Sequence, residues 1–296
     1  MIFSTYQPED LLNKRDPKLI QSMLPFWEFV YNFYFRVETD GWHHIPEQGS
    51  VLFVGSHNGG LAAPDMHMFL VDWYRRFGVQ RSAYGLMQRE VLSSPDAAAS
   101  AARMGALPTD PRMATAALRR GAPVLVYPGG IDDVFRPYSQ RHRIELAGRK
   151  GFIKLALREN VPIIPLVSLG AHETLVVLTD CKDLMQFLRQ RGIIDDSTPI
   201  TRVFPIYFGL PWGLAMGAAP NIPLPTKMYT RVCSPIRFER FGRKAARDRE
   251  YVDACYEQVR QHMQASLDDL VGLVGGSFSK GGIIKHGGVR HTERGR

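Results

Sequence analysis

Short apolar runs alternate along the chain with stretches in which apolar residues recur every three or four positions. The runs predict strands, because a buried strand reads as a short continuous hydrophobic segment. The expected strands cover residues 51–54, 82–87, 124–127, 163–167, 203–207 and 228–232. The periodic stretches predict helices over residues 66–77, 95–103, 112–120, 149–158 and 182–191. This alternation is typical of an α/β protein with a mixed central sheet flanked by helices.

The C-terminal part of the chain predicts one long helix followed by a tail. Apolar residues recur every four positions between Asp248 and about Leu270, which gives a helix one buried stripe. No internal repeat or linker-like change of composition occurs before residue 275, so we expect a single domain over residues 1–274. Residues 275–296 contain seven glycines and five basic residues against one acidic residue, which predicts a flexible basic tail.

Two aromatic or apolar stretches bear on membrane contact. Residues 19–37 are rich in Phe, Trp and Tyr but include Glu28 and Arg36, which favours an N-terminal interfacial amphipathic helix, with a core helix as the alternative. Residues 203–226 carry no charge, yet five prolines and three glycines exclude a lipid-exposed transmembrane helix. We expect a short strand there, followed by an apolar loop that lines an acyl-chain tunnel, enters a bilayer or packs in the core.

Composition narrows the class of protein. Charged residues make up 22% of the 296 residues and hydrophobic residues 45%, which excludes disordered, collagen-like and disulfide-scaffold proteins. Three widely separated cysteines and an N-terminus without a signal-like pattern favour a reducing, cytoplasmic location. The net charge of +8 points to an anionic partner, but half of it lies in the tail. Because the aromatic residues cluster in charge-free stretches, we expect no nucleic-acid partner.

The segment VLFVGSHNGGLAAPD, residues 51–65, carries the first candidate chemistry. A hydrophobic strand delivers His57 into a glycine-rich turn, and Asp65 follows at the start of the next helix. A histidine at a strand end can act as a general base near neutral pH, and a nearby carboxylate can hold its tautomer. The structural alternative is that His57 only closes a loop and Asp65 only caps a helix.

The segment GAPVLVYPGGIDDVFRP, residues 121–137, carries the second. A strand again enters a turn, here at Pro128, Gly129 and Gly130. Glycines let backbone N–H groups approach a ligand oxygen, whether on a phosphate or on a developing oxyanion. An ordinary glycine-rich turn is the structural alternative.

Together with the segments GLMQRE (85–90), MGALPTD (104–110), GRKGFIKLALRENVPIIPLVSLGAHET (148–174) and IPLPTKMYTRVCSPIRF (222–238), these motifs occur in a familiar order. Over residues 26–240 the chain resembles the glycerolipid acyltransferase superfamily, which includes the 1-acylglycerol-3-phosphate acyltransferases. It is most similar to the actinobacterial and diacylglycerol-acyltransferase-like branches, in which the third motif contains PGG.

The resemblance implies acyl transfer from acyl-CoA, a co-substrate, to a hydroxyl group of a lipid. It assigns His57 as the general base and Asp65 as the carboxylate that orients it. Arg89, in the second motif, would contact the headgroup or CoA, and Gly129 and Gly130 would shape the oxyanion or phosphate turn. No serine elbow or Cys/His pair marks a covalent nucleophile, which agrees with direct attack on a thioester.

Two departures from the family pattern concern the site. Seven residues separate His57 from Asp65, where the commonest family spacing is four, so the turn between them must bulge if the pair is to meet. The third motif has Gly129 where phosphate-acceptor enzymes commonly have Glu, and Asp132 where they have Arg. We expect compensation from Arg89, Arg136, Arg141 or Arg143, with Arg136 as a substrate contact, or else the acceptor is neutral.

We therefore expect an acyl-CoA-dependent O-acyltransferase acting on a glycerolipid or lysophospholipid, peripherally bound at the inner face of the membrane. One alternative is a neutral acceptor, diacylglycerol or a long-chain alcohol. The other is a catalytically inactive member that binds lipid or serves as a scaffold. We expect no metal or other cofactor, because the spacing of five His and Asp candidates follows no established ligand pattern: His43, His44, His57, Asp65 and His67.

Overall fold

The computed structural model describes residues 7–88, 94–194 and 202–279. A central seven-stranded sheet has the order β1-β10-β6-β2-β5-β3-β4. Only the pair β10 and β6 is antiparallel, so the sheet is mixed, as predicted. Its strands are β1 (Glu38–Asp40), β2 (Leu52–Val54), β3 (Tyr84–Met87), β4 (Ala106–Pro108), β5 (Val124–Val126), β6 (Ile163–Leu169) and β10 (Tyr229–Val232). A separate antiparallel sheet contains β7 (Val176–Thr179), β8 (Ile206–Gly209) and β9 (Gly213–Met216).

The described helices are α1 (Pro8–Leu12), α2 (Pro17–Phe29), α3 (Pro64–Phe77), α4 (Pro95–Arg103), α5 (Pro111–Arg119), α6 (Ile131–Val134), α7 (Gly151–Glu159), α8 (Lys182–Gln190), α9 (Gly242–Ala245) and α10 (Arg249–Ser279). The first five begin with proline, whose fixed φ and missing N–H suit the first helical position. Asp16, Ser94 and Asp110 cap α2, α4 and α5 through their side-chain oxygens. These local signals account for the accuracy with which the sequence predicts most helix starts.

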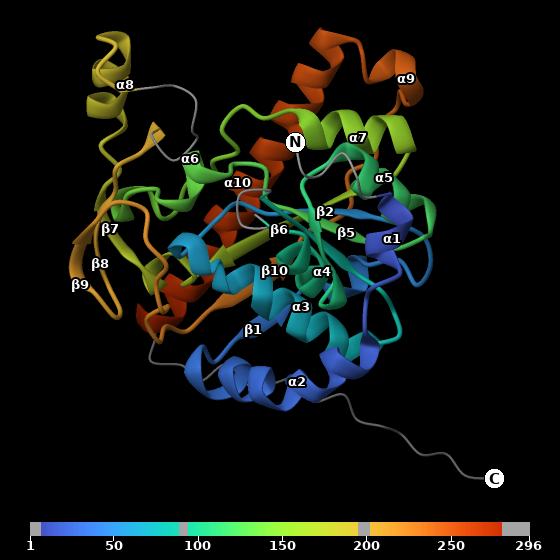
Figure 1. Ribbon diagram of the computed structural model, residues 1–296, viewed down its shortest axis with the longest axis horizontal. Helices are drawn as coiled ribbons and strands as arrows, with labels where there is room; N and C mark the ends of the chain where they lie inside the picture. The colour runs from blue at the N-terminus through green and yellow to red at the C-terminus, as the bar shows by residue number, and fades with distance from the viewer. Residues whose placement is uncertain (1–6, 89–93, 195–201, 280–296) are drawn as a thin grey trace.

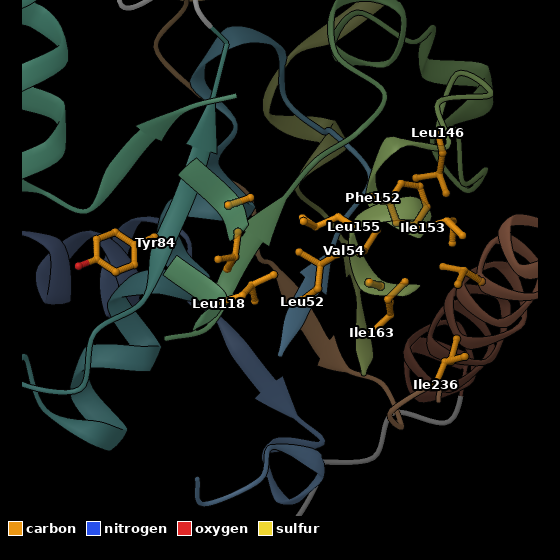
Figure 2. Packing of buried hydrophobic residues seen from close by; sticks show 14 of the residues in the cluster. Leu52, Val54, Tyr84, Leu118, Leu146, Phe152, Ile153, Leu155, Ile163 and Ile236 are labelled. Carbon is orange, nitrogen blue, oxygen red and sulfur yellow. The ribbon is translucent and has the colours of Figure 1, made fainter. Parts of the chain in front are cut away.

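Helices cover both faces of the central sheet because alternate strand residues point to opposite sides. Leu52 and Val54 pack on one side with residues of α5, α7 and α10, as Figure 2 shows for the first two of these helices. Phe53 points to the other side, where Phe69 and Trp73 of α3 pack with residues of α2. In Figure 1, α5 and α7 lie above the central strands and α2 lies below them. The fold is thus a single α/β domain of the predicted class.

Two expected boundaries need correction. The last helix, α10, runs to Ser279, so regular structure extends past residue 274, the expected end of the domain. The remaining tail, residues 280–296, lies outside the described residues. The uncharged stretch 203–226 forms a hairpin of two strands, β8 and β9, where one strand and a loop are expected. Trp212, Leu214 and Met216 are exposed and do not pack in the core, whereas Tyr207 of β8 is fully buried.

The N-terminal aromatic stretch forms α2 and a π-helical turn, Val30–Tyr34. Ile20 and Leu24 are buried, whereas Phe26, Phe29 and Phe33 are exposed. This segment is therefore amphipathic, with aromatic residues on its free side. Among the helices of the described ranges, none combines the length and the apolar run needed to cross a bilayer.

Candidate active site

The two glycine-rich turns meet because β2 and β5 are parallel neighbours. Leu52 pairs with Val124, and Val54 pairs with Val126. The carboxyl ends of both strands therefore lie at one edge of the sheet, where α/β proteins place their ligands. His57 follows β2 and Tyr127 follows β5, and their ring centroids are 5.0 Å apart. The structure thus brings the first and third motifs together.

Asp133, on α6, ties the two turns to each other. Its carboxylate is fully buried and accepts a hydrogen bond of 2.6 Å from the backbone N–H of His57. Ser56 donates a second one, at 3.2 Å. Burial raises the pKa of Asp133 to about 7, and its ion pair with Arg136 opposes that shift. The sequence analysis did not select Asp133, which lies in the four-residue helix α6, three residues before Arg136.

Arg136 is buried to 1% exposure beneath the His57 loop. Besides Asp133, its guanidinium donates to the carbonyl oxygen of His57 at 3.3 Å, to the side-chain oxygen of Asn58 at 3.1 Å and to the carbonyl of Gln140 at 3.2 Å. Every branch of the guanidinium thus has protein partners. This placement makes Arg136 a support of the loop, in place of the substrate contact expected from the sequence.

The His57 imidazole lies at the surface of this network. The residue is partly exposed, but its Nδ1 is buried and, among the described residues, has no hydrogen-bond partner. Desolvation, reinforced by the positive charge of Arg136, lowers the pKa of His57 to about 4. The ring is therefore neutral at physiological pH, the state that a general base requires.

Asp65 returns to the site without reaching His57. The turn between them does bulge, with positive φ at Gly59, Gly60 and Ala63. The Asp65 carboxylate, however, accepts its hydrogen bonds from the Asn58 side chain at 3.0 Å and the Met66 backbone at 2.9 Å. The expected His57–Asp65 hydrogen bond is therefore not formed within the described residues.

Burial raises the pKa of Asp65 to about 6. The same carboxylate contributes to the raised pKa of Tyr127, whose ring neighbours His57, after desolvation as the main cause. Asp65 is thus joined by a hydrogen bond to Asn58, the residue that follows His57, and not to His57 itself.

The third-motif turn requires both of its glycines. A Cβ on Gly129 would lie 2.3 Å from the Cβ of Asp133. Gly130 has φ +58°, and a Cβ there would lie 2.9 Å from Nη1 of Arg149 and 3.0 Å from Nε2 of Gln88. The second motif, the third motif and the start of α7 therefore converge on the open side of Gly130.

Positive side chains from three segments surround Asp132 at this turn. Arg149 lies 3.1 Å from the Asp132 carboxylate and Arg202 lies 3.5 Å from it, while Lys182 donates to the Asp132 carbonyl oxygen at 2.7 Å. Arg149 also contributes to the lowered pKa of His57, so its positive charge acts on the His57 ring. The sequence analysis missed this group because its members are far apart along the chain. The predicted contact Arg89 lies outside the described residues.

A second histidine, His172, lies behind Arg136. It is 4% exposed, and its Nδ1 is 3.4 Å from the Arg136 guanidinium. Burial lowers its pKa to about 3, so it is neutral as well. Within the described ranges, no three His, Cys, Asp or Glu residues gather as a potential metal-binding group.

The fold and site define an α/β protein whose neutral histidine lies beside a glycine-rich turn at the carboxyl edge of parallel strands. Residues 36–169 match the family model described as Acyltransferase, and residues 113–266 match the one described as Diacylglycerol acyltransferase. The chain belongs to the glycerolipid acyltransferase superfamily, as its motifs predict.

Similar proteins include mycobacterial relatives without an assigned function. An uncharacterized protein of Mycobacterium tuberculosis is 30% identical over 246 residues, which cover 82% of this chain and 64% of the relative. An uncharacterized protein of Mycobacterium leprae is 27% identical over 253 residues, 85% of this chain and 65% of the relative. The chain thus spans just under two thirds of the length of these relatives.

Among solved structures, the chain has a distant likeness to the 1-acyl-sn-glycerophosphate (LPA) acyltransferase PlsC from Thermotoga maritima. The TM-score is 0.49 and the sequence identity is 13%, over 85% of this chain and 79% of that chain.

Proposed function

We propose that this protein transfers a fatty acyl group from acyl-CoA to a hydroxyl group of a glycerolipid, with His57 as the general base. In the reaction, Nε2 of His57 accepts the hydroxyl proton while the acceptor oxygen forms a bond to the thioester carbonyl carbon. The C–S bond then breaks, and the CoA thiolate takes up the proton. The chemistry needs a neutral imidazole and donors for the developing oxyanion.

The observation that carries the proposal is the attachment of the His57 loop to the glycine-rich turn. Asp133 holds the His57 backbone at 2.6 Å, and α6, which carries Asp133, follows Gly129 and Gly130 directly. A substrate bound against this turn would therefore lie next to the base. In our proposal, Asp65 leaves Asn58 and accepts the Nδ1–H of His57 when substrate binds, since catalytic hydrogen bonds are often open in free enzymes.

The cations around Asp132 favour an acceptor or donor that carries a phosphate group. Asp132 stands in the third motif where phosphate-acceptor enzymes commonly have an arginine. Arg149 and Arg202, from segments outside the motif, supply positive charge at the same place. A phosphate on the lipid acceptor and the phosphates of CoA present the same chemistry to these side chains. We also propose that the protein works as a peripheral protein at the cytoplasmic face of the inner membrane, where both substrates meet.

The test is a transfer assay with labelled acyl-CoA and a panel of acceptors: lysophospholipids, glycerol 3-phosphate, diacylglycerol and a long-chain alcohol. We expect His57→Ala to lower kcat/KM by about 10²–10⁴-fold, because a positioned base contributes that much. His43→Ala, which removes an exposed histidine, is the matched control and should keep full activity.

Wild-type activity that survives His57→Ala would reject the assignment of the base. Absence of transfer to every acceptor, with specific lipid binding, would instead support the inactive-member alternative, which the unformed His57–Asp65 hydrogen bond keeps open. A product formed only from diacylglycerol or the alcohol would identify a neutral acceptor.

A further inference from the structure

The small sheet formed by β7, β8 and β9 has two different faces. Its inner residues Val177, Tyr207 and Ala215 pack against α6, which carries Asp133. Cross-strand pairing places Val176 opposite Phe208. It likewise places Phe208 opposite Leu214 and Ile206 opposite Met216. These pairs belong to the outer face. Figure 1 shows the three strands at the left edge of the molecule, outside the central sheet.

The outer face is apolar although it is exposed. Leu178, Phe208, Leu214 and Met216 are 58%, 52%, 69% and 68% exposed. A solvated face of an antiparallel sheet normally carries polar residues that alternate with the buried ones. A continuous exposed apolar patch marks a binding surface.

Side chains next to the sheet enlarge the same surface. Leu210 and Ile222 form an isolated bridge at the end of the β8–β9 hairpin, and both are exposed. Trp212, at the hairpin turn, is 57% exposed, and its indole N–H donates to the Pro220 carbonyl at 2.8 Å. We call these seven residues the outer apolar face: Leu178, Phe208, Leu210, Trp212, Leu214, Met216 and Ile222.

The outer apolar face is connected to the active-site loop. The side chain of Asn221, beside Ile222, donates to the carbonyl oxygen of Gly59 at 3.2 Å. Gly59 lies two residues after His57, and the next apolar residue of that loop, Leu61, is 41% exposed. Exposed apolar side chains therefore lie on both sides of the contact between this hairpin and the His57 turn.

Charge distribution identifies the occupant. Residues 203–226 carry no charge, and the residues that flank them in the sequence, Arg202 and Lys227, are both basic and exposed. An uncharged apolar surface whose flanking segments carry basic residues is complementary to the interface of an anionic bilayer. Both cations already lie near acidic groups, Asp132 at 3.5 Å and Glu38 at 2.7 Å, so apolar contact supplies the larger part of the attraction.

We propose that the outer apolar face rests in the interface of a lipid bilayer and admits the lipid acceptor to the His57 loop from the membrane side. The admission of the acceptor rests on the proposed acyltransferase function, whereas the membrane contact does not. The face acts in addition to the exposed aromatic residues of α2, which come from a different part of the chain.

The experiment is flotation of the purified full chain with vesicles of phosphatidylglycerol and phosphatidylcholine. The test variant is Leu214→Thr/Met216→Thr, which replaces two outward residues of β9 with a residue that strands accept readily. Phe241→Thr is the matched control, since Phe241 is 60% exposed and directly precedes α9. In Figure 1, α9 lies on the opposite side of the molecule from β7, β8 and β9.

We expect the double variant to lose about tenfold or more of its partitioning into vesicles, because binding scales with the apolar area inserted. The control should bind as the wild type does, and the loss should persist at high salt. With a short-chain acceptor dissolved in water, the double variant should keep wild-type turnover.

Equal flotation of the wild type and the double variant would overturn the proposal, as would a wild type that does not bind vesicles. If the double substitution instead converts a dimer into a monomer without changing flotation, the face is a contact between two copies. The double variant could lose flotation while the wild type transfers no acyl group to any acceptor. That combination would support the proposed membrane contact and reject only the proposed acyltransferase function.

Discussion

Asp133 and Arg136 form a buried ion pair whose members also hold the backbone of His57. Removing one partner of such a pair leaves an uncompensated charge in the interior. We expect Asp133→Ala to lower the free energy of unfolding by about 3–5 kcal/mol, measured by denaturant titration. The neighbouring Asp132 makes only surface ion pairs, so Asp132→Ala should cost about 1 kcal/mol or less. Equal effects of the two substitutions would contradict this assignment.

In the proposed reaction, two ionisable groups set the acid limit of activity. The His57 imidazole must be unprotonated, and its pKa of about 4 keeps it neutral well below the usual titration range near pH 6.5. Asp65 must be ionised to accept the Nδ1–H of His57, and its pKa is raised to about 6. As pH falls, kcat/KM should therefore decline first near pH 6 and more steeply towards pH 4. Arg149→Gln removes a positive charge that lowers the pKa of His57, so it should move the second decline to higher pH.

A pH–rate profile of the free enzyme measures this limit. The decline near pH 6 is assigned to the Asp65 carboxylate, so Asp65→Asn should lower activity and remove this decline. A decline near pH 6.5 that persists in Asp65→Asn would belong to His57 and would contradict its described environment.

At the scale of elements, the site depends on the short connection from β5 to α6. The turn is so close to α6 that a Cβ on Gly129 would overlap the Asp133 side chain. We expect Gly129→Ala to destabilise the protein by about 1–3 kcal/mol, the usual cost of overpacking, and to weaken catalysis because it displaces Asp133 from His57. Thermal unfolding and the transfer assay measure the two effects.

The control is Gly151→Ala at the start of α7, where a Cβ meets no atom within 4 Å and φ is ordinary. That substitution should be neutral or slightly stabilising, because alanine reduces the freedom of the unfolded chain. A Gly129→Ala protein as stable as Gly151→Ala would show that the turn adapts, contrary to the geometry described.

Elements with strong local patterns were predictable, and short elements without such a pattern were not. Pro64, Pro95 and Pro111 mark the starts of their helices, and the apolar stripe of α10 extends over many turns. The three-residue strands β2 and β5 were predicted from their continuous apolar runs. The strands β1 (Glu-Thr-Asp) and β4 (Ala-Leu-Pro) have the same length, but β1 is polar and β4 ends in proline. The hairpin strand β9 was missed because glycines bound its four residues, a pattern typical of a loop.

For the whole molecule, the sequence predicted the α/β class and the family, and the family resemblance assigned roles to both His57 and Gly129, since these follow from motifs at strand ends. It could not separate Asp132 from Asp133, which are adjacent and chemically identical, yet only Asp133 is fully buried. Nor could it foresee the burial of Arg136, because arginine is usually exposed. Tertiary packing decides both.

The alternation of inward and outward residues in β8 and β9 has an evolutionary consequence. Inward residues such as Tyr207 pack in the cluster that contains residues of α6, while outward residues such as Leu214 are exposed and lie outside that cluster. Selection can therefore exchange the outward set without disturbing the inward one. In an organism with a different membrane composition, the outward residues can be substituted while the reacting groups stay unchanged. The same positions can be varied independently in protein engineering.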